Sequence, residues 1–319
     1  MQKILIQGGG IAALVASWEL IKKQKYILDI AAPSAAPVGS ASWYAGGMLA
    51  PYCERESSEA LIQNAGVKAI EWWQENFPNL VNKTGTLVLA TSRDQSELER
   101  FAAQTEHYSY LNSQEIAILE PDLAGRFDTA LFYKDEAYLN PRQILMHLKE
   151  QLANKGANFI NPFAQQIDES KYSYIISATG IDAKNDLTQL RGVRGEMLLL
   201  KCEDIKLSRS IRLLHPRIPL YIVPRPNGEF MIGATMIESD SSAPITARSM
   251  MELLSAAYAL HPAFGNATIL ESSVGVRAAF PDNLPRIDAS GKYISINGLY
   301  RHGYLISPYL AQQLVQLLQ

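Results

Sequence analysis

The chain contains little cysteine and little histidine, and neither residue type is arranged to hold a metal. Its two cysteines, Cys53 and Cys202, lie far apart along the chain. A disulfide framework or a thiolate metal site is therefore not expected. The five histidines form no i, i+4 pair and no cluster with cysteine, at positions 107, 147, 215, 261 and 302. We predict that the protein binds no metal ion.

The chain also lacks an excess of charge of one sign. It has 29 Lys and Arg against 32 Asp and Glu, a net charge of -3 and a pI near 6.0. Proteins that bind nucleic acid or anionic membranes usually carry a basic surface, so neither partner is expected. The N-terminus shows no charged region, long apolar run or cleavage site. No signal peptide or transmembrane helix is predicted, and we expect a cytoplasmic protein.

The N-terminus has the pattern of a dinucleotide-binding fold. Residues 3–7 read as a short buried strand, three glycines follow, and an amphipathic helix then runs to about residue 21. Gly8 permits a tight turn, Gly10 lets the backbone approach a pyrophosphate, and the small Ala13 permits close packing of helix on strand. These glycines alone do not distinguish NAD from FAD. The expected contacts to the dinucleotide are Gly8, Gly10, Ile11, Ala12 and Ala13.

The carboxylate that usually contacts the adenosine ribose is missing. It is expected at the end of the second strand, about twenty residues beyond the glycines. That strand covers residues 26–30, where Asp29 lies inside the strand and Ala31 occupies the expected register. We expect Ser34 or backbone groups to take its place.

Two further segments have small residues and hydroxyl groups that suit contact with a dinucleotide. A loop rich in Ala, Ser, Pro and Gly covers residues 31–47, and a buried strand over residues 174–180 ends in Ala-Thr-Gly. Between them, Asn140 and Pro141 are predicted to begin a helix that Gly156 ends. The candidate cofactor contacts in the two segments are Ser40, Ser42, Gly46, Gly47, Met48, Thr179 and Gly180.

From Gly195 onward the pattern changes to longer strands with alternating polarity. Strands are predicted over residues 196–201, 220–224 and 229–235, and Asn227-Gly228 is a strong hairpin signal between the last two. A helix over residues 247–260 and a strand over 274–279 follow. The predicted fold is α/β: a Rossmann-like domain of residues 1–50, 138–194 and 271–319, with an interleaved antiparallel-sheet α+β domain of residues 51–137 and 195–270.

Near the C-terminus, an arginine with a glycine on either side precedes the last predicted helix. A strand over residues 293–296 runs into a loop with Gly298, Arg301 and Gly303, and a helix is predicted from Ser307 to Leu318. The N-terminal end of that helix suits a group that gains negative charge, as a reduced flavin does. The alternative is an ordinary turn with a surface arginine. The candidate cofactor contacts are Arg301, His302, Gly303, Tyr304 and Leu305.

Taken in order, these segments resemble the D-amino-acid oxidase (DAO) superfamily of FAD-dependent amine oxidoreductases, and within it the glycine oxidases of the ThiO type. The resemblance spans essentially the whole chain. Its other carriers are Ala41 to Pro51, Arg194 to Met197, Tyr221 to Arg225, Gly233 to Met236, Gly275 to Arg277 and Leu299 to Gly303.

The resemblance implies a fold of the glutathione-reductase-like class with non-covalently bound FAD. It implies oxidative deamination of glycine, or of a small amine such as sarcosine, to the imino acid. O₂ would be reduced to H₂O₂, and the iminoacetate would supply the thiazole moiety of thiamine. The resemblance further implies a functional link to thiazole synthase and is compatible with a homo-oligomer.

Three residues receive catalytic roles from the resemblance. Arg277 would pair with the substrate carboxylate and lie near the flavin, since guanidinium geometry suits a bidentate carboxylate contact. Tyr221 would donate a hydrogen bond to the same carboxylate, and Arg301 would flank the site and add positive potential. Without the resemblance, an internal salt bridge for Arg277 and a packing role for Tyr221 remain open.

The substrate is less determined than the cofactor. Some glycine oxidases carry histidine two residues before the tyrosine, where this chain has Pro219. Together with His215, Pro216 and Leu220, Pro219 is predicted to form a stiff, narrow wall that favours glycine and sarcosine.

Three other functions remain as alternatives. The first is a sarcosine or D-amino-acid oxidase or dehydrogenase on the same fold. The second is an FAD-dependent accessory protein that assists a modifying enzyme, although the charge balance argues against a tRNA substrate. The third is a nicotinamide dehydrogenase, which the inserted antiparallel sheet disfavours.

Overall fold

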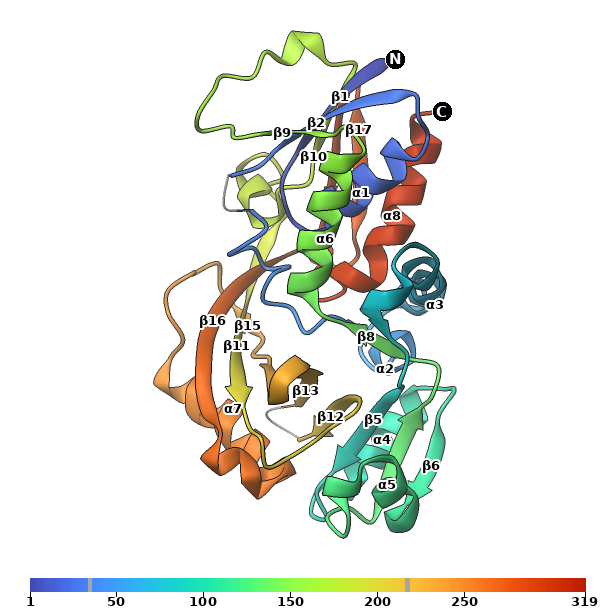
Figure 1. Ribbon diagram of the computed structural model, residues 1–319, viewed down its shortest axis with the longest axis vertical. Helices are drawn as coiled ribbons and strands as arrows, with labels where there is room; N and C mark the ends of the chain where they lie inside the picture. The colour runs from blue at the N-terminus through green and yellow to red at the C-terminus, as the bar shows by residue number, and fades with distance from the viewer. Residues whose placement is uncertain (34–35, 216–218) are drawn as a thin grey trace.

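The computed structural model describes residues 1–33, 36–215 and 219–319, and it contains two large sheets (Figure 1). The first has six strands in the order β17-β18-β10-β1-β2-β9, and only β17 is antiparallel to its neighbour. Its strands are β1 (Gln2–Gln7), β2 (Tyr26–Ala31), β9 (Asn158–Ile160), β10 (Tyr174–Ser177), β17 (Arg286–Ser290) and β18 (Tyr293–Asn297).

Helices cover one face of this first sheet. Figure 1 shows α1 (Ile11–Ile21), α6 (Pro141–Asn154) and α8 (Gly303–Leu317) beside one another on this face. The opposite face is covered by the segment after β9, where Ile167 and Tyr172 pack against Leu5 and Ile175. The arrangement confirms the predicted Rossmann-like domain. In such sheets, ligands bind at the carboxyl ends of the parallel strands.

Both chain termini lie at the end of the first sheet that is remote from the second sheet (Figure 1). The phenolic hydroxyl of Tyr26, at the start of β2, donates to the carbonyl oxygen of Leu318 at 3.1 Å. This bond fixes the C-terminal end of α8 beside the amino ends of the parallel strands.

The second sheet has nine strands and is antiparallel except where β12 pairs with β5. One face is apolar and packs against α7 (Ala247–Leu260) through Leu253, Ala257 and Leu260. The other face carries Tyr221 and Arg277 and is turned toward the first sheet's loops. The strands are β5 (Thr86–Ala90), β6 (Ser109–Asn112), β7 (Thr129–Tyr133), β11 (Arg191–Lys201), β12 (Ser210–Leu214), β13 (Leu220–Arg225), β14 (Glu229–Gly233), β15 (Ile237–Glu238) and β16 (Thr268–Ala279).

A small sheet and several helices connect the two large sheets. The small sheet has the order β3-β8-β4, formed by β3 (Met48–Leu49), β8 (Ala137–Leu139) and β4 (Val81–Asn82). The helix α3 (Ala60–Asn76) packs against α8 and belongs to the same hydrophobic core as α1. The predicted domain boundaries remain a prediction. They assign residues 51–137 to the antiparallel-sheet domain, but α3, which lies in that range, packs into the core of the Rossmann-like domain. The remaining helices are α2 (Pro51–Glu54), α4 (Gln95–Gln104) and α5 (Ser113–Leu119).

Elements with strong local signals were predicted correctly. Asn227 and Gly228 take positive φ angles of 62° and 69° in the turn between β13 and β14. The helix α7 has the predicted bounds, and the side chain of Asn140 caps α6 by accepting a hydrogen bond from the Arg142 amide at 3.1 Å.

The predicted start of the last helix was wrong. The helix α8 begins at Gly303, four residues before Ser307, and Pro308 lies inside it. Proline has no amide hydrogen to donate to the carbonyl of Tyr304. That carbonyl instead accepts a hydrogen bond from the indole Nε1 of Trp73 at 2.8 Å. The distant tryptophan thus replaces the missing helical bond.

Candidate functional site

Segments that are far apart in the sequence meet at the carboxyl end of β1. The Oγ of Ser42 accepts a hydrogen bond from the Ile11 amide at 3.0 Å, at the start of α1. The hydroxyl of Tyr304, in the first turn of α8, donates to the carbonyl of Ser42 at 2.8 Å. The loop over residues 40–47 is therefore held between the N-terminal ends of α1 and α8.

Glycines allow this close approach. Gly8 has a φ angle of +124°, and a Cβ atom there would lie 2.4 Å from the Ala178 carbonyl oxygen at the end of β10. Gly47 has a φ angle of +74°, and a Cβ atom there would lie 2.2 Å from the carbonyl oxygen of Leu139. No other residue fits either position without moving the backbone.

The other predicted cofactor contacts lie around this meeting point. A Cβ atom at Gly303 would lie 3.2 Å from Ile11, and the carbonyl of Gly180 accepts a hydrogen bond from Asn297 at 2.9 Å. Thr179 directly precedes Gly180, and Met48 follows the loop as the first residue of β3. The structure therefore brings the predicted glycine-rich turns to one edge of the first sheet.

Some predicted contacts have side chains that are already occupied or that point elsewhere. Ser40 donates to the carbonyl of Pro37 at 2.7 Å, and Leu305 packs against Gly66 of α3. Ala13 is completely buried between helix and sheet. These residues can offer only backbone groups to a cofactor, or, like Ala13, the small size that lets the helix approach.

Tyr221 lies on the face of the second sheet that is turned toward the loop over residues 40–47. A Cβ atom at Gly46 would lie 2.7 Å from the ring of Tyr221, and one at Gly233 would lie 2.9 Å from its hydroxyl oxygen. Burial raises the pKa of the Tyr221 hydroxyl, although Arg277 opposes the shift. The hydroxyl therefore stays protonated at neutral pH and can donate a hydrogen bond.

Arg277 lies on the same face, which its strand pairing determines. Gly275 pairs with Gly195, and Arg277 follows Gly275 by two residues, so its side chain lies on the face of Gly195. The guanidinium covers the bare backbone of Gly195, where a Cβ atom would lie 2.4 Å from Nη2. Its Nη1 donates to the carbonyl of Thr235 at 3.1 Å.

Arg277 has no carboxylate partner in the part of the chain that the structure describes. The alternative that Arg277 serves an internal salt bridge is therefore unsupported among these residues. A half-buried guanidinium without an acid beside it can receive the carboxylate of a substrate.

Arg301 differs from Arg277 because its charge is compensated. Its Nε and Nη2 lie 2.9 and 2.7 Å from Oε2 of Glu54, at the end of α2. Arg212 lies 3.5 Å from the other oxygen of Glu54. Burial opposes ionisation of Glu54, but Arg301 and its neighbours hold the pKa of this carboxyl at about 2. The predicted role of Arg301 beside the substrate stays a prediction, and the structure shows Arg301 as one half of an ion pair rather than as a free positive charge.

His302 belongs to the same cluster. Its Nε2 lies 3.1 Å from the Oγ of Ser58, and its Nδ1 lies 3.3 Å from Glu54 without forming a hydrogen bond. Burial lowers the pKa of His302 to about 4 despite the nearby carboxylate. The imidazole is therefore neutral at physiological pH.

Sequence reasoning missed Arg225, which holds the loop against the second sheet. Its Nη2 donates to the carbonyl of Gly46 at 2.8 Å, and burial lowers its pKa to about 10. Arg225 lies four residues after Tyr221 on β13 and therefore on the same face. The even spacing of Arg225 from Tyr221 was the feature of the sequence that could have identified Arg225. No signal identified Glu54, because its partner Arg301 is 247 residues away.

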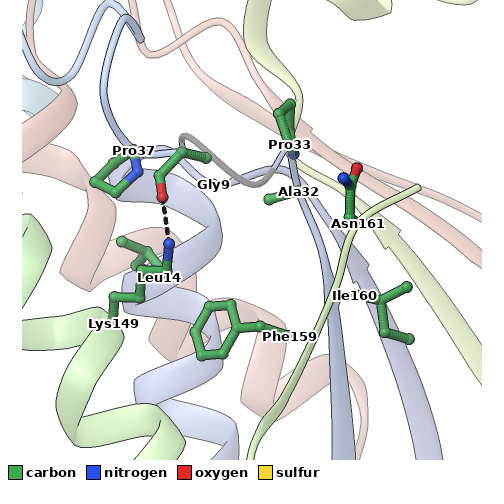
Figure 2. Close-up of a pocket in the computed structure, with 10 residues that line it drawn as sticks. Gly9, Leu14, Ala32, Pro33, Pro37, Lys149, Phe159, Ile160 and Asn161 are labelled. Carbon is green, nitrogen blue, oxygen red and sulfur yellow. Dashed lines mark hydrogen bonds between the residues drawn. The ribbon is translucent and has the colours of Figure 1, made fainter. Parts of the chain in front are cut away.

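A cavity of about 230 Å³ opens at the carboxyl ends of β1, β2 and β9 (Figure 2). Gly9, Ala32 and Pro33 line it from the strand ends, and Lys149 lines it from α6. Whole ligand sites measure roughly 300–1,000 Å³, so this cavity suits one end of a dinucleotide. It lies where the adenosine half is expected in this type of fold.

The missing strand-end acid is not replaced by Asp29. The carboxylate of Asp29 accepts hydrogen bonds from Tyr172 at 2.5 Å and Asn158 at 3.2 Å and lies 2.8 Å from Lys3. The Asp29 carboxylate is therefore engaged by protein partners and does not serve as the ribose-binding acid. Ser34, the predicted substitute, lies outside the described residues.

One member of the predicted narrow wall before Tyr221 does not face the site, and the rest of the wall stays a prediction. Leu220 is buried in the core beneath α7, on the face opposite to Tyr221, so its side chain does not border the site. This part of the prediction was wrong because neighbouring strand residues point to opposite faces. Pro216 lies outside the described residues, and Pro219 directly precedes β13.

Within residues 1–33, 36–215 and 219–319, no three His, Cys, Asp or Glu side chains are grouped so as to hold a metal ion. In the same ranges, the helices are too short or too polar to cross a membrane.

Comparison with known proteins gives consistent matches. The family model DAO, described as FAD dependent oxidoreductase, matches residues 3–317. A Rhizobium etli protein with the provisional name thiamine biosynthesis oxidoreductase ThiO is 46% identical over 314 residues, which cover 98% of this chain and 95% of the relative. A bifunctional protein ThiO/ThiG of Synechocystis is 26% identical, and the match covers 97% of this chain and 50% of that protein.

The fold is shared with solved structures. The crystal structure of glycine oxidase from Geobacillus kaustophilus superposes with a TM-score of 0.82 at 21% identity, covering 99% of this chain and 95% of that chain. At this level of identity the likeness establishes the architecture of both sheets.

Proposed function

Because the chain belongs to the DAO family of FAD-dependent oxidoreductases, we propose that it oxidises the Cα–N bond of glycine, or of a small amine such as sarcosine. The substrate loses two hydrogens and becomes the imino acid, and O₂ gains them to become H₂O₂. The observation that carries this proposal is Arg277, a cation with no acid beside it among the described residues, on the same sheet face as the hydroxyl of Tyr221.

The residues present fit FAD. Backbone amides at the start of α1, the glycine turns at residues 8 and 47, and the cavity of about 230 Å³ follow one edge of the first sheet. Backbone amides at a helix N-terminus suit the pyrophosphate, and the cavity suits the adenosine. When bound, FAD would supply the two-electron chemistry, which no side chain here can perform.

The side chains of this chain would bind and orient the substrate. Arg277 would hold the carboxylate through two parallel hydrogen bonds, and Tyr221 would donate a third. Glycine at positions 46, 195 and 233 lets the side chains of Tyr221 and Arg277 lie directly against the backbone. Fixing the carboxylate in this way fixes the direction of the Cα–H bond, and such orientation contributes much of the rate in reactions of this kind.

A role in thiamine biosynthesis is supported by the relatives. The Rhizobium etli relative carries thiamine biosynthesis in its name, and the Synechocystis relative is named as a fusion of ThiO and ThiG. We propose that the imino acid made by this chain is used by a thiazole synthase.

The proposed function is tested by adding glycine to the purified yellow protein without oxygen. Bleaching of the flavin absorption is expected, and admission of air should restore the colour with release of H₂O₂. Protein that keeps its colour with glycine but bleaches with another amine would assign a different substrate on the same fold.

The substrate range should be narrow. Tyr221 packs so closely against Gly46 and Gly233 that we expect side chains on Cα to be penalised. Glycine and N-methylglycine should exceed D-alanine, and bulky D-amino acids and all L-amino acids should be poor substrates. Peroxide release across this series is the measurement. Faster turnover of D-phenylalanine or D-proline than of glycine would favour a D-amino-acid oxidase and remove the support for the thiamine role.

FAD should be bound without a covalent bond. Cys53 is fully buried and lies beyond the turn at Gly47, and burial raises the pKa of its thiol. Cys202 is buried beside Ala263, in the core beneath α7. Acid precipitation should release the yellow colour into the supernatant. Colour that remains in the pellet would contradict this prediction.

A further inference from the structure

The cavity at the carboxyl ends of β1, β2 and β9 contains a lysine where a carboxylate is usual. We propose that Lys149 of α6 binds the adenosine half of FAD and takes over the role of the missing strand-end acid. This inference depends on FAD as the cofactor and is independent of which amine is oxidised.

Lys149 is attached to the segment that follows β2. Its Nζ donates to the carbonyl oxygen of Ala36 at 2.6 Å, as the dashed line in Figure 2 shows. The same Nζ lies 5.7 Å from the centre of the Phe159 ring. The half-buried ammonium thus connects helix, loop and strand around one cavity.

The ammonium of Lys149 has hydrogen-bond donors that the described residues do not use. It can donate three hydrogen bonds, and one goes to Ala36. Within the described ranges, no carboxylate lies within ion-pair distance of Lys149. The remaining donors match the hydroxyl oxygens of a ribose or the ring nitrogens of adenine.

The other walls suit an aromatic base. Leu14, Pro37 and Ile160 are apolar, and Phe159 offers an aromatic ring to the cavity (Figure 2). Asn161 is the other polar side chain in the wall, and its Oδ1 already accepts a hydrogen bond from the Phe163 amide at 3.1 Å. A flat, largely apolar ligand with acceptors at its edge meets these requirements.

Gly9 makes the position of Ala36 attainable. A Cβ atom at Gly9 would lie 2.6 Å from the Cβ of Ala36 and 3.1 Å from that of Ala32. Any side chain there would push Ala36 away and lengthen its bond to Lys149. The middle glycine of the N-terminal triplet therefore serves the contact between Lys149 and the loop.

The test measures cofactor binding rather than turnover. Apoprotein would be titrated with FAD and, separately, with FMN, which lacks the adenosine moiety, and the Kd would be read from flavin fluorescence. Lys149→Met should raise the Kd for FAD by roughly tenfold or more, the size expected for lost hydrogen bonds to a charged group. The Kd for FMN should stay unchanged.

Matched variants separate binding from folding. Lys155→Met removes an exposed lysine at the C-cap of the same helix and should leave both Kd values unchanged. Lys149→Arg should retain part of the FAD affinity. If Lys149→Met lowers the melting temperature of the apoprotein, Lys149→Gln, which keeps a donor, should show an intermediate Kd for FAD.

Two results would overturn the proposal. One is a wild-type Kd for FAD in Lys149→Met. The other is an equal loss of FAD and FMN affinity, which would indicate a general structural role. A variant series that behaves as expected while glycine fails to bleach the flavin would leave this inference intact and reject the proposed substrate alone.

Discussion

Arg277→Ala should lower kcat/KM for glycine by about 30-fold to about 4,000-fold, which corresponds to about 2–5 kcal/mol. The loss is expected because Arg277 has no protein carboxylate beside it in the described residues, and its proposed partner is the substrate carboxylate. FAD content should stay normal, since among the described residues the guanidinium donates only to the Thr235 carbonyl, at 3.1 Å.

Two variants control this experiment. Arg277→Lys keeps the charge but loses the bidentate geometry and should recover only part of the activity. Arg248→Ala removes an exposed arginine from α7 and should change nothing. Unchanged glycine kinetics in Arg277→Ala would remove this residue from the substrate site.

Glu54→Gln should lower the free energy of unfolding by about 3–5 kcal/mol, the range for breaking a buried ion pair. The amide keeps the shape of the side chain but leaves the half-buried Arg301 without its ion-pair partner, while Arg212 keeps only the longer contact to Glu56 at 3.8 Å among the described residues. Urea unfolding at neutral pH measures the effect. Glu150→Gln, which changes an exposed acid on α6, should leave the unfolding free energy unchanged, and an equally small effect in Glu54→Gln would reject the ion pair.

The same cluster should make the stability depend on pH. The pKa of Glu54 falls from 4.5 to about 2 on folding, so its contribution is complete above pH 4.5 and is lost as pH falls toward 2. The pKa of His302 falls from 6.5 to about 4, so the unfolded chain gains this proton first and stability also declines below pH 6.5. Glu54→Gln should lose the part of this dependence that lies between pH 4.5 and 2.

Features that depend on neighbouring residues could be predicted from the sequence. The glycine turn after β1 and the hairpin at Asn227-Gly228 require particular backbone angles, and few residues other than glycine and asparagine adopt them. The cap of Asn140 on α6 is local in the same sense. These signals sufficed for both sheets and for the edge at which a cofactor would bind.

Features that depend on distant partners could not be predicted. The start of α8 depends on Trp73, and the state of Arg301 depends on Glu54. Lys149 reaches the carbonyl of Ala36 across 113 residues of sequence. Each of these contacts forms only when the helices pack on the sheet. A local sequence pattern therefore cannot predict them. The orientation of Leu220 is a different case, because it follows from the alternation of side chains along β13, which is a local property.

The position of the two termini has a consequence for how the chain can be joined to other proteins. Both ends lie at the amino edge of the parallel strands, and Tyr26 anchors the last turn through the Leu318 carbonyl. A domain appended to the C-terminus would sit at the pole of the molecule opposite the second sheet and would not obstruct Arg277 or Tyr221. Tethering a second protein at this pole would thus leave the face that carries Arg277 and Tyr221 accessible.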